Sequence, residues 1–289
     1  MDATLRPWRS MLYIPGSNAR ALDKARDLPC DAIIFDLEDA VAVAEKATAR
    51  DLLCQALRQG GYGDRALLVR INPLSSEWGQ ADLEAVAAVA PQSILLPKVA
   101  GPDDIAQAAR LLDDAGATGE TNIWAMIETP QGVLNAPAIA RAQRMQGFVI
   151  GTNDLAQELG CRHRPDRLPL LQALQSCLLA ARAAGIMCID GVYNAFRDLD
   201  GLALECAQGR DLGMDGKTLI HPGQIETANR VFSPDADEIE TARRQIAAFE
   251  AAEAEGRGVA VLDGRIVENL HVAGARRTLA RARATGVNS

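Results

Sequence analysis

Charged side chains recur in this sequence directly after short apolar runs, where buried parallel strands would end. Asp36-Leu-Glu38-Asp39 follows one such run, Glu128 follows a second, and Gly151-Thr-Asn-Asp154 follows a third. Charges so close to an apolar core are costly unless they are paired or bound to a metal. The pattern therefore indicates a site rather than a purely structural arrangement.

Glu128 and Asp154 are the candidate metal ligands, because consecutive strands would bring their carboxylates to one point. Two carboxylates completed by water and substrate oxygens suit Mg²⁺, and we expect Mn²⁺ to be able to replace it. Glu38 and Asp39 would repel this pair without a cation between them. We interpret Asp39, with Glu38 beside it, as an outer residue that holds a metal-bound water. The alternative, in which the carboxylates cap helices or pair with nearby cations, stays open.

Three cationic or imidazole side chains also follow apolar runs. Arg70 presents the planar fork that binds a carboxylate through two bonds, although a structural ion pair with Glu38 or Glu128 would use the same fork. Lys98 and His221 are further candidate substrate-binding residues, and Lys98 alternatively balances charge. The sequence has no GxSxG, P-loop or nicotinamide fingerprint, which argues against hydrolase, NTPase and dehydrogenase functions.

Two patterns of apolar residues, one typical of strands and one of helices, alternate along the sequence that must position these residues. Apolar runs typical of strands buried on both faces are separated by segments with helical spacing, such as Ile105, Ala108, Ala109 and Leu112. The spacing predicts eight strands, at Met11–Pro15, Ala32–Asp36, Leu67–Ile71, Ile94–Pro97, Ile123–Ile127, Phe148–Ile150, Met187–Ile189 and Thr218–Ile220. Eight such units predict an α/β fold, a (β/α)8 TIM barrel, with an open doubly wound sheet as the alternative.

Beyond the barrel, the sequence predicts a C-terminal helical extension. Asp235–Glu255 has the pattern of a charged amphipathic helix, a turn follows at Val259–Gly264, and Val272–Ala284 forms a last helix. We therefore predict a catalytic barrel over residues 1–232 and an arm or lid over residues 233–289. A helical cap on the chain's own barrel is the alternative to an arm that contacts a neighbouring subunit.

Composition narrows the functional class. With 30 basic and 38 acidic residues the net charge is −8, which argues against nucleic-acid and membrane surfaces as partners. The sequence has neither an apolar run long enough to span a membrane nor a signal-peptide core, and its six cysteines form no CxxC pair. We therefore expect a soluble cytoplasmic protein with reduced thiols.

At these motifs the sequence resembles the HpcH/HpaI aldolase/citrate lyase superfamily, and most of all its citrate lyase beta-subunit and malyl- or citramalyl-CoA lyase branch. The resemblance runs from Arg9 to the terminal helix and is carried by motifs in family order. They are Asp36-Leu-Glu-Asp-Ala-Val41 with Lys46 and Ala49-Arg50, Arg70-Ile-Asn, Pro97-Lys-Val, Ile127-Glu-Thr, Gly151-Thr-Asn-Asp-Leu and Ile220-His-Pro-Gly-Gln224.

The resemblance implies a barrel, Mg²⁺ held by Glu128 and Asp154, and Arg70 on the substrate carboxylate. It also implies that the loop after the first strand contacts CoA. Tyr13 and Lys24 match family positions there, whereas a family arginine is replaced by Asn18, with Arg20 two residues on.

Similarity to the family's C-terminal arm implies a residue shared between subunits. The family carries an aspartate that reaches into a neighbouring active site, and Glu268 takes its place here, in Asp263-Gly-Arg-Ile-Val-Glu268. We interpret Glu268 as the acid–base residue of a homotrimer or hexamer, with a surface glutamate as the alternative.

These features together predict a Mg²⁺-dependent carbon–carbon lyase. Its substrate would be a 3-hydroxyacyl-CoA of the malyl-CoA or citramalyl-CoA type, and its products acetyl-CoA and an oxo-acid, glyoxylate or pyruvate. Three alternatives remain: a citrate lyase beta subunit acting on a carrier-protein thioester, an aldolase for free hydroxy-oxo-acids, and a non-catalytic binding barrel. The aldolase ranks lower, because related enzymes rely on an early histidine and the first one here is His163.

Overall fold

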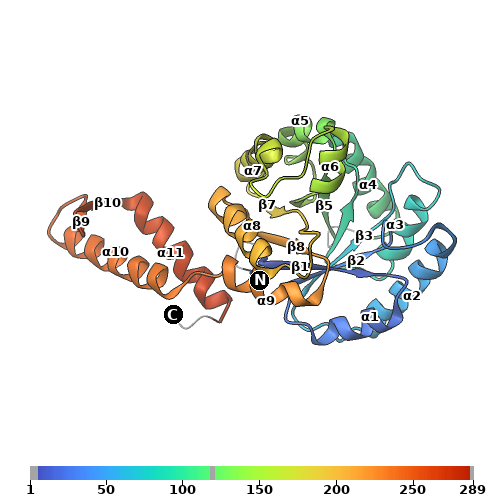
Figure 1. Ribbon diagram of the computed structural model, residues 1–289, viewed down its shortest axis with the longest axis horizontal. Helices are drawn as coiled ribbons and strands as arrows, with labels where there is room; N and C mark the ends of the chain where they lie inside the picture. Colours follow the sequence, from blue (N-terminus) through green and yellow to red (C-terminus); the bar gives the residue numbers. More distant parts are fainter. Residues whose placement is uncertain (1–5, 118–120, 287–289) are drawn as a thin grey trace. The chain divides into compact units, whose positions relative to one another are not determined.

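The computed structural model describes residues 6–117 and 121–286, which divide into two compact units. The first unit, Trp8–Asn229, is a closed barrel of eight parallel strands in sequence order (Figure 1). The strands are β1 Ser10–Pro15, β2 Ala32–Asp36, β3 Ala66–Arg70, β4 Ser93–Leu96, β5 Asn122–Ile127, β6 Met145–Ile150, β7 Met187–Asp190 and β8 Gly216–Leu219. The predicted (β/α)8 barrel is confirmed.

Helices surround the barrel and connect its strands (Figure 1). They are α1 Ala19–Lys24, α2 Lys46–Gln59, α3 Gly79–Ala87, α4 Pro102–Asp114, α5 Pro130–Ile139, α6 Thr152–Glu158, α7 Leu171–Ala184 and α8 Leu199–Leu212, followed by α9 Ile225–Phe232. The helix α4 shows how the sequence specifies them: Pro102 opens it, and Asp104 accepts a hydrogen bond from the Gly101 amide. None of the helices among the described residues is long and apolar enough to cross a membrane.

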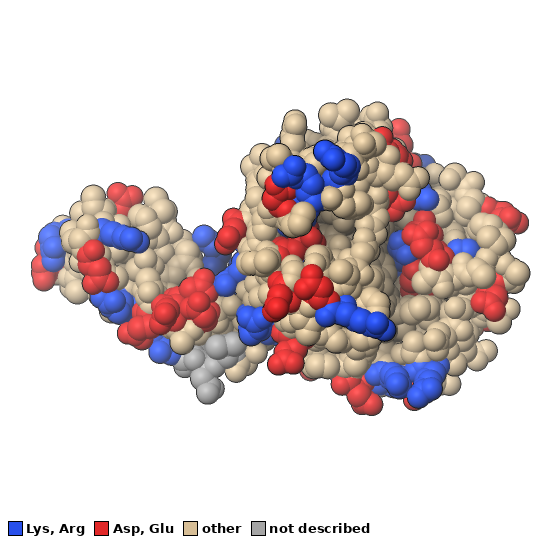
Figure 2. Space-filling model, viewed as in Figure 1, with Lys and Arg blue, Asp and Glu red and all other residues tan. Residues whose placement is uncertain are grey.

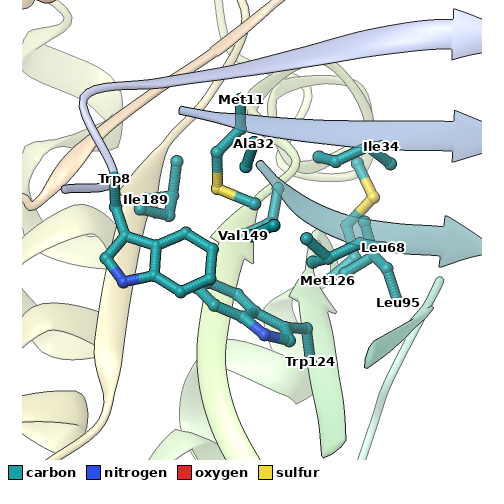
Figure 3. Packing of buried hydrophobic residues seen from close by; sticks show 11 residues of the cluster. Trp8, Met11, Ala32, Ile34, Leu68, Leu95, Trp124, Met126, Val149 and Ile189 are labelled. Carbon is teal, nitrogen blue, oxygen red and sulfur yellow. The ribbon is translucent and has the colours of Figure 1, made fainter. Parts of the chain in front are cut away.

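The barrel interior is filled by large apolar side chains rather than left as a pore. Figure 3 shows the rings of Trp8 and Trp124 near the start of the strands and Met126 closer to their tips. The Trp124 ring needs Gly147 on the adjacent strand, because a Cβ there would lie 2.4 Å from the ring. This packing fills the amino-terminal end of the barrel with apolar side chains.

The second unit contains the C-terminal segment from Arg230 onward. Two helices, α10 Ala236–Ala254 and α11 Asn269–Ala284, pack together with a hairpin of β9 Ala260–Leu262 and β10 Arg265–Val267 (Figure 1). The turn expected at Val259–Gly264 is thus part of a hairpin, and the last helix begins at Asn269 rather than Val272. Asp263 and Gly264 have φ values of 49° and 75°, as a tight Asp-Gly hairpin turn requires.

Candidate functional site

A cavity of about 350 Å³ opens at the carboxyl ends of the barrel strands. Its polar lining includes Arg70, Asp39 and Asp154, which come from three different strand ends. Its apolar lining includes Met126, Ile150, Val192 and Ile220. The barrel therefore brings together four of the residues that the sequence singled out, because Tyr13 lines the cavity as well, and it does so at the end where catalytic groups of such barrels cluster.

Arg70 ends β3 and is the cation of this cavity. Its Nε and Nη2 donate to the two carboxylate oxygens of Asp36, at 2.7 and 2.6 Å. Its Nη1 lies 3.1 Å from Asp39 Oδ2, and the ring of Tyr13 covers the guanidinium at 5.0 Å. The side chain is only 6% exposed, so its charge is offset by these neighbours rather than by water.

Glu38 is a buried carboxylate with too few partners. Its Oε2 lies 2.9 Å from Arg70 Nη1 but makes no aligned hydrogen bond, and Lys98 Nζ is 3.9 Å from Oε1. Burial, opposed by Arg70 and reinforced by the charge of Asp39, raises the pKa of Glu38 to about 7. A polar atom left unpaired in this way has capacity for a further donor or cation.

Glu128 follows β5 and is almost completely buried, with 1% of its surface exposed. Its Oε1 accepts a hydrogen bond of 2.6 Å from the Lys98 amide, which faces it because Lys98 has a φ of 53°. Burial and the nearby charge of Glu38 raise the pKa of Glu128 to about 8. Gly151 makes room for this side chain, since a Cβ there would lie 2.5 Å from Glu128 Oε2.

Asp154 stands in the first turn of α6, half-buried at the edge of the cavity, and its charge also raises the pKa of Glu128. The described residues contain no group of three or more histidine, cysteine or acidic side chains placed to hold a metal. A pair of carboxylates, Glu128 and Asp154, is a donor set that suits Mg²⁺, which keeps several waters. The raised pKa values of Glu38 and Glu128, and the Glu38 oxygen that accepts no hydrogen bond, fit a divalent cation at this point.

The loop after β2 that carries Glu38 and Asp39 is fixed by hydrogen bonds to its backbone carbonyls. The Lys46 ammonium, 6% exposed, donates to the carbonyls of Leu37 and Glu38 at 2.9 and 2.6 Å. The Asn72 amide donates to the Leu37 carbonyl at 3.0 Å. Because the loop is anchored through its backbone, the acidic side chains are held next to Arg70 and do not depend on that cation alone for their place.

Several residues predicted to bind substrate do not line the cavity. Arg20 and Lys24 are exposed on α1, where Asn18 caps the helix by accepting from the Ala21 amide at 3.0 Å. His221 is exposed, its Nδ1 accepts from the Gly223 amide at 3.0 Å, and its ring lies 4.8 Å from that of Phe196. Their predicted contacts with a thioester remain predictions.

Lys98 and Glu268 also stand outside the cavity lining. The Lys98 side chain is half exposed; its backbone amide donates to Glu128, and its ammonium lies 3.9 Å from Glu38 Oε1. Glu268 belongs to the second unit, where it is exposed at the start of α11 and its amide donates to His271 Nδ1 at 3.1 Å. The structure of one chain leaves the role predicted for Glu268 untested.

Sequence reasoning missed two groups that shape the cavity. Asp36 was read only as part of a strand-end motif, yet it takes both donors of the Arg70 fork, so the structural ion pair that Arg70 makes is with Asp36 and with Glu38. Met126 places its sulfur 3.8 Å from Arg70 Nη1 and 3.9 Å from the Tyr13 hydroxyl. The pairing of Asp36 with Arg70 follows from the register of β2 and β3, which sets the two residues opposite each other.

Comparison with known proteins shows the family to which the chain belongs. The family model described as HpcH/HpaI aldolase/citrate lyase covers residues 9–222. A (3S)-malyl-CoA thioesterase of Cereibacter sphaeroides is 59% identical over 278 residues, which are 96% of this chain and 95% of the relative. Citrate lyase subunit beta of Escherichia coli is 39% identical over 288 residues, 98% of this chain and 95% of the relative.

Among solved structures, CitE of Mycobacterium tuberculosis in complex with magnesium, acetoacetate and coenzyme A superposes with a TM-score of 0.78. It is 28% identical, and the match covers 96% of this chain and 97% of that one. Citrate lyase beta subunit from the same organism, complexed with oxaloacetate and magnesium, gives a TM-score of 0.69 at 29% identity over 81% of this chain and all of that one. Both neighbours were crystallised with the cation that a paired-carboxylate site suits.

Proposed function

The chain belongs to the HpcH/HpaI aldolase/citrate lyase family, as its motifs predicted, and we propose that it is a magnesium-dependent enzyme acting on a 3-hydroxyacyl-CoA thioester of the malyl type. The observation that carries this proposal is the cavity in which Arg70 faces the carboxylates of Asp154 and Asp39, with Glu128 buried beside it. One cation among the lining residues matches a substrate with one free carboxylate, as malyl-CoA has.

In this proposal Glu128 and Asp154 would hold Mg²⁺, which when bound would supply Lewis-acid polarisation of substrate oxygens. Arg70 orients the free carboxylate through Nη1, the part of the fork that faces the cavity. The apolar wall formed by Met126, Ile150 and Val192 excludes water around the acyl chain, which strengthens these charge interactions. The cytoplasm is the compartment we propose, since all six cysteines are free and five are buried.

Carbon–carbon cleavage is the reaction typical of this family. The C3 hydroxyl loses its proton, the C2–C3 bond breaks, and its electron pair passes to the enolate of acetyl-CoA, which then takes a proton; the other product is glyoxylate. We propose that Asp39, which is 64% exposed and lines the cavity, accepts the first proton. Glu268 of a neighbouring subunit is our candidate donor of the second.

Hydrolysis of the same thioester is the second candidate, and one observation favours it. Four Cereibacter sphaeroides relatives named (3S)-malyl-CoA thioesterase are 58–59% identical over 96% of this chain, well above the 39% of citrate lyase subunit beta. Water would attack the thioester carbonyl, the C–S bond would break, and malate and CoA would leave. The missing GxSxG motif therefore argues only against a serine nucleophile, because a carboxylate such as Asp39 would activate water directly.

A product analysis tests the proposal. Purified protein is incubated with (3S)-malyl-CoA with and without Mg²⁺, and acetyl-CoA, glyoxylate, malate and free CoA are measured by chromatography. Turnover that requires Mg²⁺ supports the substrate class. Acetyl-CoA with glyoxylate would identify cleavage of the carbon–carbon bond, and malate with CoA would identify hydrolysis of the thioester. The names of the most similar relatives reported above favour malate and CoA. Turnover of a citryl carrier-protein thioester in place of malyl-CoA would contradict the proposal.

We further propose that residues 233–289 act as an arm on a neighbouring subunit of a homotrimer or hexamer. The outer face of the β9–β10 hairpin carries Val261 and its cross-strand partner Ile266, which are 67% and 61% exposed. Leu270 beside Glu268 is 64% exposed. Apolar side chains clustered in sequence around Glu268 support a covered surface there, so Glu268 would reach an active site only in the oligomer.

A further inference from the structure

Asp36 and Arg70 occupy one rung of the barrel sheet. They are register partners at the last residues of β2 and β3, so adjacent strands deliver the two side chains to the same height. The pairing is parallel and double, with Nε 2.7 Å from Oδ1 and Nη2 2.6 Å from Oδ2. The Asp36 side chain is 2% exposed and that of Arg70 is 6% exposed, so water does not compete with these bonds.

This pairing decides which edge of the guanidinium a substrate can meet. The Nε/Nη2 edge is taken by Asp36, and the ring of Tyr13 lies over the guanidinium at 5.0 Å. Nη1 lies 2.9 Å from Glu38 Oε2, donates to Asp39 Oδ2 at 3.1 Å and approaches the sulfur of Met126; Asp39 and Met126 line the cavity. Arg70 is therefore held by one edge and turned towards the cavity by the other.

Asp36 also connects Arg70 to the acidic loop. Its Oδ1 accepts from the Glu38 amide at 2.9 Å, and its Oδ2 accepts from the Ala40 amide at 3.0 Å. Each carboxylate oxygen thus receives one backbone and one guanidinium hydrogen bond. A carboxylate accepts all four bonds, two at each oxygen. The side-chain amide of asparagine would not, because its NH₂ group would face one backbone N–H and one guanidinium N–H, which are donors themselves.

We propose that Asp36 is a positioning residue that fixes the Arg70 guanidinium so that Nη1 binds the substrate carboxylate, an assignment that rests on the proposed function. Without the charge of Asp36, the guanidinium is drawn to Glu38 and the Nη1 edge leaves the cavity. Asp36 itself contacts no reacting atom in this account. Its effect on turnover passes through Arg70.

A double-mutant cycle separates this role from a purely structural one. We expect Asp36→Asn to lower kcat/KM for malyl-CoA on the order of 100-fold, mostly through KM, with Mg²⁺ affinity retained. In the Arg70→Lys background the same change should cost less than about threefold, because the group that Asp36 positions is already absent. An equal loss in both backgrounds would overturn the proposal and assign Asp36 to the turn alone.

A matched control exists at the other end of the same strand. Asp31 pairs with Arg9 through two bonds of 2.8 Å, and it also accepts from the Arg9 amide, but it stands just before β2. We expect Asp31→Asn to lower Tm and to leave kcat/KM within about twofold of the parent. A second variant, Asp36→Glu, keeps the charge but displaces the fork by one methylene, and we expect at least about a tenfold loss; a fully active Asp36→Glu would contradict the positioning role.

A readout that needs no turnover distinguishes this proposal from the proposed function. The Nε–H of Arg70, assigned by its loss in Arg70→Lys, should give a downfield, slowly exchanging NMR signal in the parent and in Asp31→Asn. In Asp36→Asn it should move upfield and exchange fast. A parent that does not act on malyl-CoA would refute the proposed function, and an unchanged Nε–H signal in Asp36→Asn would refute the positioning of Arg70.

Discussion

The two ends of β2 carry the same kind of ion pair, an aspartate with an arginine, in different surroundings. At the amino-terminal end Asp31 binds Arg9, and at the carboxyl end Asp36 binds Arg70, each through two parallel bonds of 2.6 to 2.8 Å. Backbone amides add hydrogen bonds to both aspartates, one to Asp31 and two to Asp36. The second pair differs because further carboxylates, Glu38 and Asp39, share its guanidinium.

The surplus of negative charge is what distinguishes the second end. Asp36, Glu38 and Asp39 share the guanidinium of Arg70, Glu128 and Asp154 stand close by, and the pKa values of Glu38 and Glu128 are raised as a result of burial and repulsion among these carboxylates. A barrel needs only closed pairs such as Arg9–Asp31 for stability. Carboxylates left in excess cost stability, so their presence indicates a cation that arrives with function.

Arg70→Lys should have the largest effect of the side-chain changes that leave the metal ligands intact. Lysine keeps the charge, but it cannot bind Asp36 through two bonds and still reach the substrate, so we expect a loss on the order of 2–5 kcal/mol in transition-state binding. Steady-state kcat/KM measures it. Arg9→Lys is the control and should lower Tm while kcat/KM stays near the parent value; similar activity losses in both variants would remove the distinction between the two ends.

Glu268→Gln should have the next largest effect, because it removes a titrating proton and keeps the shape. We expect kcat to fall on the order of 100-fold, the low end for a general acid, with Mg²⁺ binding and oligomeric state unchanged. Mixing these subunits with Asp154→Asn subunits allows an intact barrel to meet an intact arm. Recovery of activity would support a shared site, whereas no recovery despite proven exchange would mean that Glu268 serves its own barrel or no catalytic step.

Mg²⁺ binding should depend on pH through Glu128 and Glu38. Their pKa values, about 8 and about 7, are raised, so the metal-free folded protein holds protons that Mg²⁺ must displace. We expect apparent affinity to fall as pH drops below about 8, and proton release on binding near pH 7. Calorimetry in buffers of different ionisation enthalpy measures that release.

The raised pKa of Glu128 also predicts how the stability of the metal-free protein depends on pH. A carboxyl whose folded pKa is raised favours folding while it is protonated, and this contribution is lost as pH rises from the unfolded value towards about 8. The metal-free protein should therefore lose stability between pH 5 and pH 9 relative to Glu128→Gln. Equal profiles for the two proteins would argue against a protonated Glu128.

Lys98→Gly should have the smallest effect. Lys98 has a φ of 53°, which glycine adopts without strain, and its amide holds Glu128 whichever side chain is present. We expect stability to be kept or to rise by up to about 1 kcal/mol, and Lys98→Ala to be less stable than Lys98→Gly. If kcat/KM falls equally in both variants, the ammonium group rather than the backbone is what matters.

The sequence predicted the strands well because each is a short, wholly buried apolar run. The predicted Ala32–Asp36 strand is observed unchanged, and Ile123–Ile127 differs by one residue at its start. The β9–β10 hairpin was missed, since runs of three residues around Asp263-Gly264 are too short for periodicity to be read. Strand ends, which carry the site, depend on the same burial signal and were therefore placed to within one residue.

Which side chains contact each other across the barrel was harder to predict than where the strands lie along the chain. Arg70 was expected to offer its fork to substrate, but the pairing with Asp36 follows from sheet register, which apolar periodicity does not encode. Arg20 and Lys24 were chosen by resemblance, and neither the burial pattern nor helix geometry directs them into the cavity. What a side chain contacts depends on neighbours distant in sequence.

The central claim is that the surplus carboxylates at the carboxyl end of the barrel bind a divalent cation, and calorimetric titration of Mg²⁺ into the metal-free protein tests it most directly. We expect one site per chain in the parent and in the control Asp31→Asn, and a loss of at least about 100-fold in affinity in Asp154→Asn with an unchanged circular dichroism spectrum. Equal Mg²⁺ affinity in Asp154→Asn and the parent would contradict the account.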